Sequence, residues 1–320
     1  MLDNFLYNQK ELKTLENKEI KKYINKKSSY LWIKATKISH EEMDFLKETF
    51  NFHPTTIEDI LSKHTRIKYE EFEEYTLIVF KGIKEIKENY VKTYNVSFVM
   101  GENFIVSFNE GDNEIIEELS KNHKKIENFL KKGEDYIAHY ILDKEVDKYL
   151  RIKIESGENL KEIEKEFMKN QDKETLKKIF SKELIFLELR HLSESITDLC
   201  LDLTKPADNF IHNELIPYFR DVYDHSLKTA EGYKSMLERI NGMKNMHSTV
   251  ISMRTNEVIK ALTIIMVIMM PLTVITGFYG MNISLPFQEY SNSWMILIII
   301  MFGISLMMYL IFDKLRSRIR

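Results

Sequence analysis

The chain has 320 residues, and its 46 basic and 49 acidic side chains give a formal net charge of −3. That length is typical of about two domains, and 44% hydrophobic residues with only 10 Gly and 5 Pro exclude collagen-like and low-complexity proteins. The single cysteine, Cys200, excludes an internal disulfide framework and a multi-cysteine zinc ribbon, and the near-neutral charge balance gives no indication of nucleic-acid binding.

The first hundred or so residues contain short runs rich in β-branched and aromatic side chains. These runs predict strands at residues 29–33, 75–83, 91–100 and 103–108. Helices are predicted at residues 39–50 and 55–63, and Ser39 with Glu42 has the spacing of a capping box. The N-terminus carries no basic and then apolar signal segment, so we expect this part of the chain in the cytoplasm.

From residue 113 onward the hydrophobic pattern becomes helical. No proline occurs between Pro54 and Pro206, and residues 145–203 are rich in Lys, Glu and Leu. This composition predicts long antiparallel helices whose charges lie on solvated faces. Residues 1–205 are therefore predicted to form an α+β cytosolic domain, a small mixed sheet extended by long helices.

A further helix is predicted to begin near Pro206 or Pro217, because no proline then follows until Pro271. Only two glycines weaken it, and a glycine in a helix interior costs about 1 kcal/mol. Two helices broken near Gly242 are the alternative. We expect instead one helix that includes a cytosolic stalk, residues 206–257, and continues into the apolar segment that follows.

Two stretches near the C-terminus, residues 261–288 and 290–312, carry no charged side chain. About 20 apolar residues cross a hydrocarbon core of about 30 Å. Two buried core helices are the alternative, but such helices rarely lack charge throughout. We therefore predict transmembrane helices at residues 258–281 and 294–312, an external loop at 282–293 and a basic cytoplasmic tail at 313–320.

The charges that flank these spans predict their orientation. Basic residues precede the first span and follow the second: Arg254, Lys260, Lys314, Arg316, Arg318 and Arg320. The connecting loop has no base and one acid, Glu289. The positive-inside rule then places both termini in the cytoplasm and the loop outside, as in a multi-pass protein of the cell (inner) membrane.

The first span has a regular stripe of residues at intervals of seven: Asn256, Thr263, Met270 and Gly277. On a helix these positions form one slowly drifting line. Two helices cannot enclose an aqueous pore by themselves, but several subunits in a closed ring can. The alternative is ordinary helix packing, which also favours small residues and methionine.

The tripeptide that ends this span, Gly280-Met281-Asn282, resembles the Gly-Met-Asn signature of the CorA family of divalent-cation channels. The preceding residues 255–279 also resemble the pore helix of that family. Residues 219–225, FRDVYDH, resemble its stalk motif, and residues 53–61, which contain EDIL, resemble its cytosolic motif. The resemblance covers most of the chain.

The resemblance implies a funnel-shaped homopentamer in the lipid bilayer, with the first span lining the pore and the second packed outside it. Gly280, Met281 and Asn282 would form a selectivity filter for divalent cations. The family's other pore positions match Asn256, Leu262, Thr263, Met266, Met270 and Thr273. The assignment of Leu262 rests on the resemblance, because it lies beside the stripe.

The resemblance also implies a regulatory metal site at which intracellular Mg²⁺ holds the channel shut. Its residues here would be Asp59 and Asp221, with Glu58, Asp143 and His225 as accessory ligands. Asn245 departs from the pattern, since some members have an aspartate there, and tight binding at the inner mouth is not expected. Mg²⁺ would be both the transported and the regulatory ion, with no organic cofactor.

The function expected is therefore a Mg²⁺ and Co²⁺ channel, driven by the membrane potential and closed by intracellular Mg²⁺. One alternative is a zinc, cobalt or nickel transporter of the same family, although the scattered histidines and lone cysteine argue against softer metals. The other is a non-transporting, membrane-anchored helical scaffold. We do not expect an enzyme, because the sequence has no GxSxG, HExxH or glycine-rich phosphate loop.

Overall fold

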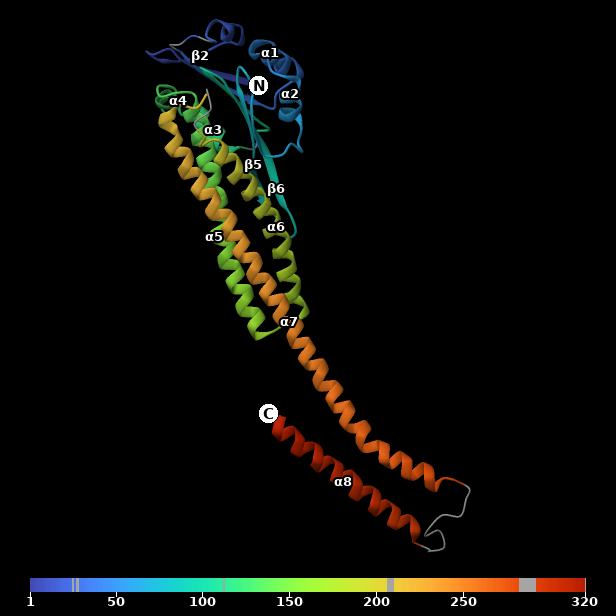
Figure 1. The fold of residues 1–320 in the computed structure, drawn as a ribbon. Helices are drawn as coiled ribbons and strands as arrows, with labels where there is room; N and C mark the ends of the chain where they lie inside the picture. Colours follow the sequence, from blue (N-terminus) through green and yellow to red (C-terminus); the bar gives the residue numbers. More distant parts are fainter. Residues whose placement is uncertain (25, 27–28, 112, 206–209, 282–291, 320) are drawn as a thin grey trace. The chain divides into compact units, whose positions relative to one another are not determined.

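The structure is a computed structural model that describes residues 1–320 except 25, 27–28, 112, 206–209, 282–291 and 320, and except the side chains of 293, 313 and 315–319. The chain divides into two compact units, Met1–Met243 and Lys244–Arg320. Each unit has its own architecture. Figure 1 labels the helices and strands.

The first unit is built on a seven-stranded mixed sheet in the order β2-β1-β3-β7-β6-β5-β4. Neighbouring strands are antiparallel except β3 and β7, which are parallel. The predicted mixed sheet is thus confirmed, although β1, β2 and β4 were not expected from the sequence. The strands are β1 (Leu2–Tyr7), β2 (Leu12–Thr14), β3 (Tyr30–Thr36), β4 (Lys68–Glu71), β5 (Thr76–Ile86), β6 (Val91–Met100) and β7 (Phe104–Asn109).

Both faces of this sheet are buried, because successive side chains along a strand point to opposite sides. Trp32 and Ile78 belong to the core on one face, and their neighbours Leu31 and Leu77 belong to the core on the other. The first face is covered by α3 (Glu114–Lys121), α4 (His123–Leu130) and the start of α5 (Asp135–Lys169). The second is covered by η1 (Asn17–Lys22), α1 (His40–Phe50) and α2 (Pro54–Leu61).

The helix α1 begins at the predicted capping box. The Ser39 hydroxyl oxygen accepts a hydrogen bond from the Glu42 backbone N–H at 3.2 Å, and a Glu42 carboxylate oxygen accepts one from the Ser39 N–H at 3.0 Å. The next helix, α2, starts at Pro54, whose fixed φ suits the first turn of a helix. These two helices match the two predicted between the strands.

Three long helices extend the unit beyond the sheet: α5, α6 (Lys173–Asp202) and the first part of α7 (Ile216–Tyr279). Only residues 170–172 separate α5 from α6, so these helices form the predicted antiparallel pair (Figure 1). Tyr149, Phe186 and Tyr233, one from each helix, lie in their common core. The rings of Phe186 and Tyr233 have centroids 5.9 Å apart.

The single cysteine lies inside this helical core. Cys200 is on α6 and is fully buried. Burial raises the pKa of its thiol to about 12, although a hydrogen bond with Ser226 acts in the opposite direction. The thiol is therefore neutral at physiological pH.

One glutamate among the helical charges is also buried. Glu145, on α5, is fully buried, and its Oε1 accepts hydrogen bonds from the Tyr94 hydroxyl at 2.6 Å and the Asn113 amide at 2.9 Å. Burial raises its pKa, and these donors partly offset the shift. The interpretation that the charges of residues 145–203 lie on solvated faces is wrong for this residue.

A second buried acidic group lies at the N-terminus of α5. Asp135 Oδ2 accepts hydrogen bonds from the His212 backbone N–H at 2.8 Å and lies 3.0 Å from His212 Nδ1. The adjacent Glu134 is 1% exposed, and its Oε2 has no hydrogen-bond partner among the described residues. Burial first, and then the charge of Asp135, raise the pKa of Glu134 well above its usual range.

The second unit contains the rest of α7 and α8 (Ser293–Ile319). α7 is one helix through Gly242 and Pro271, so the alternative of a break near Gly242 is wrong. It begins one residue before Pro217, one of the two predicted start points. Both helices contain a segment long and apolar enough to cross a membrane, and neither segment is buried within the chain.

Candidate functional site

The predicted filter begins where α7 ends. The Gly280 N–H donates to the Thr276 carbonyl at 3.0 Å, and the Met281 N–H donates to the Phe278 carbonyl at 3.2 Å. A side chain at Gly280 would place its Cβ 3.2 Å from the Thr276 carbonyl oxygen, a tight contact that glycine avoids. Met281 is 52% exposed. Asn282, the third predicted filter residue, lies outside the described residues.

The six other predicted pore residues all lie on α7, and all six side chains are exposed in the single chain. At about 100° per residue on a regular helix they fall within an arc of about 120°. That arc is one face of the helix, and it includes Leu262, which the seven-residue stripe alone left aside. The face consists of Asn256, Leu262, Thr263, Met266, Met270 and Thr273.

The chemistry of this face changes along the helix. Leu262, Met266 and Met270 make its middle apolar. The Thr263 hydroxyl donates to the Ile259 carbonyl at 2.8 Å, and the Thr273 hydroxyl donates to the Met269 carbonyl at 2.9 Å. Because each hydroxyl hydrogen is used within the helix, the oxygen is left to accept a hydrogen bond from elsewhere, for example from a water of a hydrated cation.

The first predicted regulatory residue, Asp59, lies near the end of α2. Its carboxylate forms an ion pair with Lys68 on β4, a residue the sequence analysis did not single out. The Asp59 backbone carbonyl accepts a hydrogen bond from the Thr65 hydroxyl at 2.9 Å. Glu58, one of the accessory candidates, is an exposed neighbour on the same helix.

The other regulatory candidates lie where α5 and α7 pack together. Asp143 and Asp221, one on each helix, both act on the pKa of His139; burial lowers that pKa and the two carboxylates act against the shift. One turn further along, His225 Nδ1 lies 3.8 Å from Asp147 Oδ1. We call Asp143, Asp147, Asp221 and His225 the α5–α7 acidic seam.

Asp147 is part of this seam but was missed from the sequence. The sequence feature that could have identified Asp147 is its spacing of four residues from Asp143, which places both carboxylates on one face of α5. Asp221 and His225 have the same spacing on α7. Lys144 lies between the two α5 carboxylates, with Nζ 3.2 Å from Asp143 Oδ2 and 3.0 Å from Asp147 Oδ2.

The described contacts do not join Asp59 to Asp221. In the part of the chain that the structure describes, no three His, Cys, Asp or Glu side chains converge as a metal site. Among the described residues of one chain, the predicted regulatory residues therefore do not form a complete ligand set. The donors themselves, mainly carboxylate oxygens, are of the kind that Mg²⁺ prefers.

Comparison with known proteins gives a consistent result. The family described as "CorA-like Mg2+ transporter protein" matches residues 27–314. The cobalt/magnesium transport protein CorA of Thermotoga maritima is 30% identical over 291 residues, which cover 90% of this chain and 83% of that protein.

Two solved structures show the same fold. The complete CorA magnesium transporter from Methanocaldococcus jannaschii superposes with a TM-score of 0.77 at 20% identity and covers 98% of both chains. The cytoplasmic domain of ZntB from Vibrio parahaemolyticus gives a TM-score of 0.61 at 10% identity, covering 78% of this chain and 97% of that one. The fold of most of this chain is therefore also found in a protein with a different name.

Proposed function

The chain belongs to the CorA family of Mg²⁺ transporter proteins, and we propose that it is a homopentameric channel for the uptake of hydrated Mg²⁺ and Co²⁺. One observation carries the proposal. The six pore positions share one face of α7, and this helix runs directly into Gly280 and Met281 of the signature. In a ring of five chains this single face is enough to line a continuous path.

The filter would act on the ion's water shell. Mg²⁺ gives up its waters reluctantly and is often bound through them. The neutral amide of Asn282 and nearby backbone carbonyls accept hydrogen bonds from such waters without replacing them. A ring of carboxylates would hold the ion more tightly, and conduction requires that binding stay weak enough for release.

The apolar middle of the face would form the gate. Rings of Leu262, Met266 and Met270 offer no polar group to a hydrated cation, and narrow apolar constrictions close by losing water. In sequence, Thr263 lies between Leu262 and Met266, and Thr273 follows Met270. Their hydroxyl oxygens would supply polar contacts on either side of the two methionine rings.

The membrane potential would drive uptake. With both termini in the cytoplasm, as the flanking basic residues favour, the filter faces outward. Moving one charge through 100 mV is worth about 2.3 kcal/mol, so a divalent cation gains about 4.6 kcal/mol. That corresponds to more than a thousandfold concentration ratio, and such a driving force makes regulation necessary.

Regulation would come from carboxylates that lie on different subunits. Asp59 is on α2 and the α5–α7 acidic seam is elsewhere in the same unit, so a metal ion shared between neighbouring chains would complete the ligand sets. A filled site neutralises the acids and stabilises the closed ring, whereas the carboxylates of an empty site repel each other. Mg²⁺ would then shift the population toward the closed state by its differential affinity.

The zinc, cobalt or nickel alternative has less support from the residues. The predicted pore face offers amide, hydroxyl and thioether groups but no histidine, and imidazole and thiolate are the ligands that softer metals favour. The name of the Thermotoga relative also couples cobalt with magnesium. The scaffold alternative would give the residues of the predicted filter no role.

Flux into liposomes tests the proposal. The purified full chain is reconstituted around a Mg²⁺-sensitive dye, and a potential that is negative inside is imposed. We expect Mg²⁺ influx that Co²⁺ competes with and that internal Mg²⁺ suppresses. Influx no greater than in protein-free liposomes would contradict a channel, and Zn²⁺ influx without Mg²⁺ influx would favour the zinc alternative.

A further inference from the structure

A cavity of about 400 Å³ lies on the α1–α2 face of the sheet, where β3 and β7 end. These two strands are the parallel pair, and their last paired residues are Thr36 and Asn109. Ligands of open sheets that contain parallel strands bind preferentially at the carboxyl ends of those strands. The volume is within the range of small-molecule sites, about 300–1,000 Å³.

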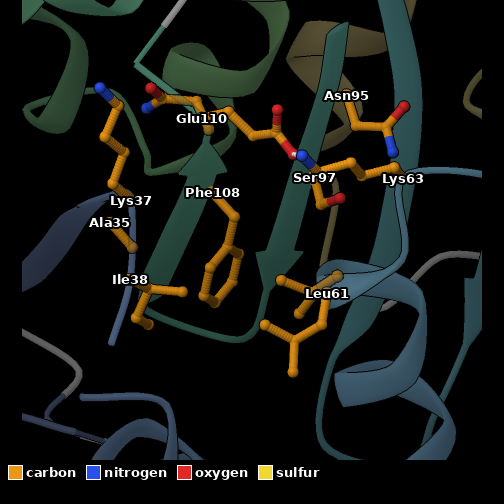
Figure 2. A pocket seen from close by; sticks show the side chains of 11 residues that line it. Ala35, Lys37, Ile38, Leu61, Lys63, Asn95, Ser97, Phe108 and Glu110 are labelled. Carbon is orange, nitrogen blue, oxygen red and sulfur yellow. Dashed lines mark ion pairs between the residues drawn. The ribbon is translucent and has the colours of Figure 1, made fainter. Parts of the chain in front are cut away.

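One end of the cavity is apolar. Ile38, Leu61 and Phe108 lie close together there in Figure 2. Phe108 is 4% exposed and anchored in the core, whereas Leu61 is 47% exposed although it is a large apolar side chain. The exposed part of the Leu61 side chain is not needed for the core, so it is available to contact an apolar ring of a ligand.

The opposite end carries two lysines. Figure 2 shows Lys37 and Lys63 on opposite sides of the opening, with Glu110 between them. Lys63 Nζ lies 4.0 Å from Glu110 Oε1, at the limit of an ion pair. In the described part of the chain, Lys37 Nζ has no carboxylate within ion-pair distance. The opening therefore has a net positive charge.

The backbone holds Lys37 in this position. Lys37 has a φ of 46°, in the left-handed region, and its N–H donates to the Asn109 carbonyl at 3.1 Å. Its side chain passes over Gly111, where a Cβ would lie 3.0 Å from Lys37 Cε. Gly111 itself has a φ of 84°. A non-glycine residue kept in a left-handed conformation is strained, and such strain is typical of functional sites.

We propose that this cavity binds a nucleoside monophosphate or a closely similar organic phosphate. The ring contacts Leu61, Ile38 and Phe108, and the phosphate receives charge-assisted hydrogen bonds from Lys37 and Lys63. An apolar pocket with a few convergent polar groups is the usual form of a small-molecule site. Neither the pore nor the regulatory carboxylates take part in this binding, so the site does not depend on the channel function.

The helix α2, which carries Asp59, also forms part of the cavity wall. Ile60 and Leu61 both line it and follow Asp59 on α2. The Asn95 amide, also in the cavity wall, donates to the Ser62 carbonyl at the end of the same helix at 2.9 Å. If Asp59 has the proposed regulatory role, a ligand here acts on the helix that carries it, and this second step rests on the proposed function.

Calorimetric titration of the full chain in detergent tests the binding step. The probes are AMP, adenosine and inorganic phosphate, each added in EDTA so that Mg²⁺ chelation plays no part. We expect saturable AMP binding, with adenosine and phosphate weaker by at least about tenfold, because each lacks half of the contacts. Absence of saturable AMP binding at millimolar concentrations, or equal binding of AMP and phosphate, overturns the proposal.

Variants locate the site. Lys37→Gln and Lys63→Gln should each weaken AMP binding by about tenfold or more, and Leu61→Ala should weaken AMP but not phosphate. Lys124→Gln, at an exposed lysine on α4, should bind AMP as the wild type does. Wild-type affinity in both cavity lysine variants would place AMP elsewhere and overturn the assignment.

The liposome assay then separates the two steps. Addition of AMP inside the vesicles should shift the Mg²⁺ concentration for half-inhibition in the wild type but not in Leu61→Ala. AMP binding without any such shift overturns the connection to Asp59 and leaves the binding site in place.

Discussion

The ammonium group of Lys68 lies 2.5 Å from Asp59 Oδ2 and 2.6 Å from Glu70 Oε2, and its side chain is only 18% exposed. Burial by itself lowers the pKa of Lys68, but hydrogen bonds and charge interactions with the two carboxylates outweigh it, so the net pKa is raised. Lys68 is therefore charged at neutral pH. A metal ion at Asp59 must share that carboxylate with a cation from the same chain.

Lys68→Met should make the channel more sensitive to intracellular Mg²⁺. The substitution keeps most of the unbranched side chain but removes the competing charge, so Mg²⁺ should bind Asp59 more tightly. We expect half-inhibition of liposome flux at a Mg²⁺ concentration roughly 1.5- to fivefold lower, the range expected for one partly exposed ion pair. Lys13→Met, which removes a lysine paired with Glu11, is the control. An unchanged or higher inhibitory concentration would show that Lys68 does not compete.

Replacing Asp59 and Asp221 together with Asn should weaken inhibition by cytosolic Mg²⁺. A bound ion stabilises the closed state by at most RT ln(1 + [L]/Kd), which is about 1.4 kcal/mol per site at ten times Kd and about 7 kcal/mol over five sites. The same variant should lose Mg²⁺ protection of the cytosolic unit against proteolysis. Wild-type inhibition together with wild-type protection would identify both residues as ordinary surface acids.

Asn282→Ala should abolish Mg²⁺ influx while leaving assembly intact. The substitution removes the amide that would accept hydrogen bonds from the water shell of the ion. Flux and the elution volume in size-exclusion chromatography are measured together. Asn159→Ala, the same change at an exposed position of α5, should retain wild-type flux. Normal influx through an assembled Asn282→Ala channel would contradict the filter assignment.

Met270→Ala should widen the apolar constriction and raise the Mg²⁺ leak at inhibitory Mg²⁺ concentrations. Met307 on α8 is similarly exposed, 64% against 67% for Met270, and Met307→Ala is the matched control, expected to stay tight. If Met270 only packs between helices, its replacement lowers thermal stability and produces no leak. A destabilised variant without a leak would therefore contradict the assignment of Met270 to the gate.

Glu134→Gln should stabilise the first unit at high pH and have little effect near pH 4. The folded-state pKa of Glu134 is raised, so the native state holds a proton that the unfolded state loses once the pH exceeds about 4.3. Wild-type stability therefore falls as pH rises from that value toward the raised folded pKa. Glutamine mimics the protonated form and removes this loss.

The expected gain from Glu134→Gln at pH 8 is about 1 kcal/mol or more, because each unit of pKa shift is worth about 1.4 kcal/mol. Thermal unfolding of the full chain between pH 4 and pH 8 measures it. Glu118→Gln, at an exposed acid of α3, should follow the wild-type profile. A constant difference between Glu134→Gln and wild type across this pH range would mean that Glu134 is not protonated in the native state.

Much of the fold could be predicted because its signals are local. The strands β5, β6 and β7 are rich in β-branched and aromatic residues, and the capping box of α1 lies within four residues of sequence. The strand β4, with the sequence KYEE, is at the edge of the sheet and carries no apolar run. The short β2 is at the other edge, and edge strands often lack the hydrophobic signal on which prediction depends.

What could not be predicted depends on contacts between distant residues. The parallel pairing of β3 with β7 joins residues about 70 positions apart. Glu145 is buried because Tyr94 and Asn113 donate to it from other elements. The Asp59–Lys68 ion pair depends on how the turn between α2 and β4 brings the two side chains together, which no local pattern in the sequence specifies. Residues of the predicted filter, pore face and regulatory site were found through motifs, and their roles stay predictions.

The buried thiol of Cys200 has a practical consequence for spectroscopy. A neutral thiol that is fully enclosed between helices does not react readily with maleimides or methanethiosulfonates. The native chain therefore behaves as a cysteine-free background, because Cys200 is its only cysteine. Single cysteines introduced along α7 can carry spin labels or fluorophores without removal of a native cysteine, and their accessibility would test whether the predicted pore face lines a water-filled path.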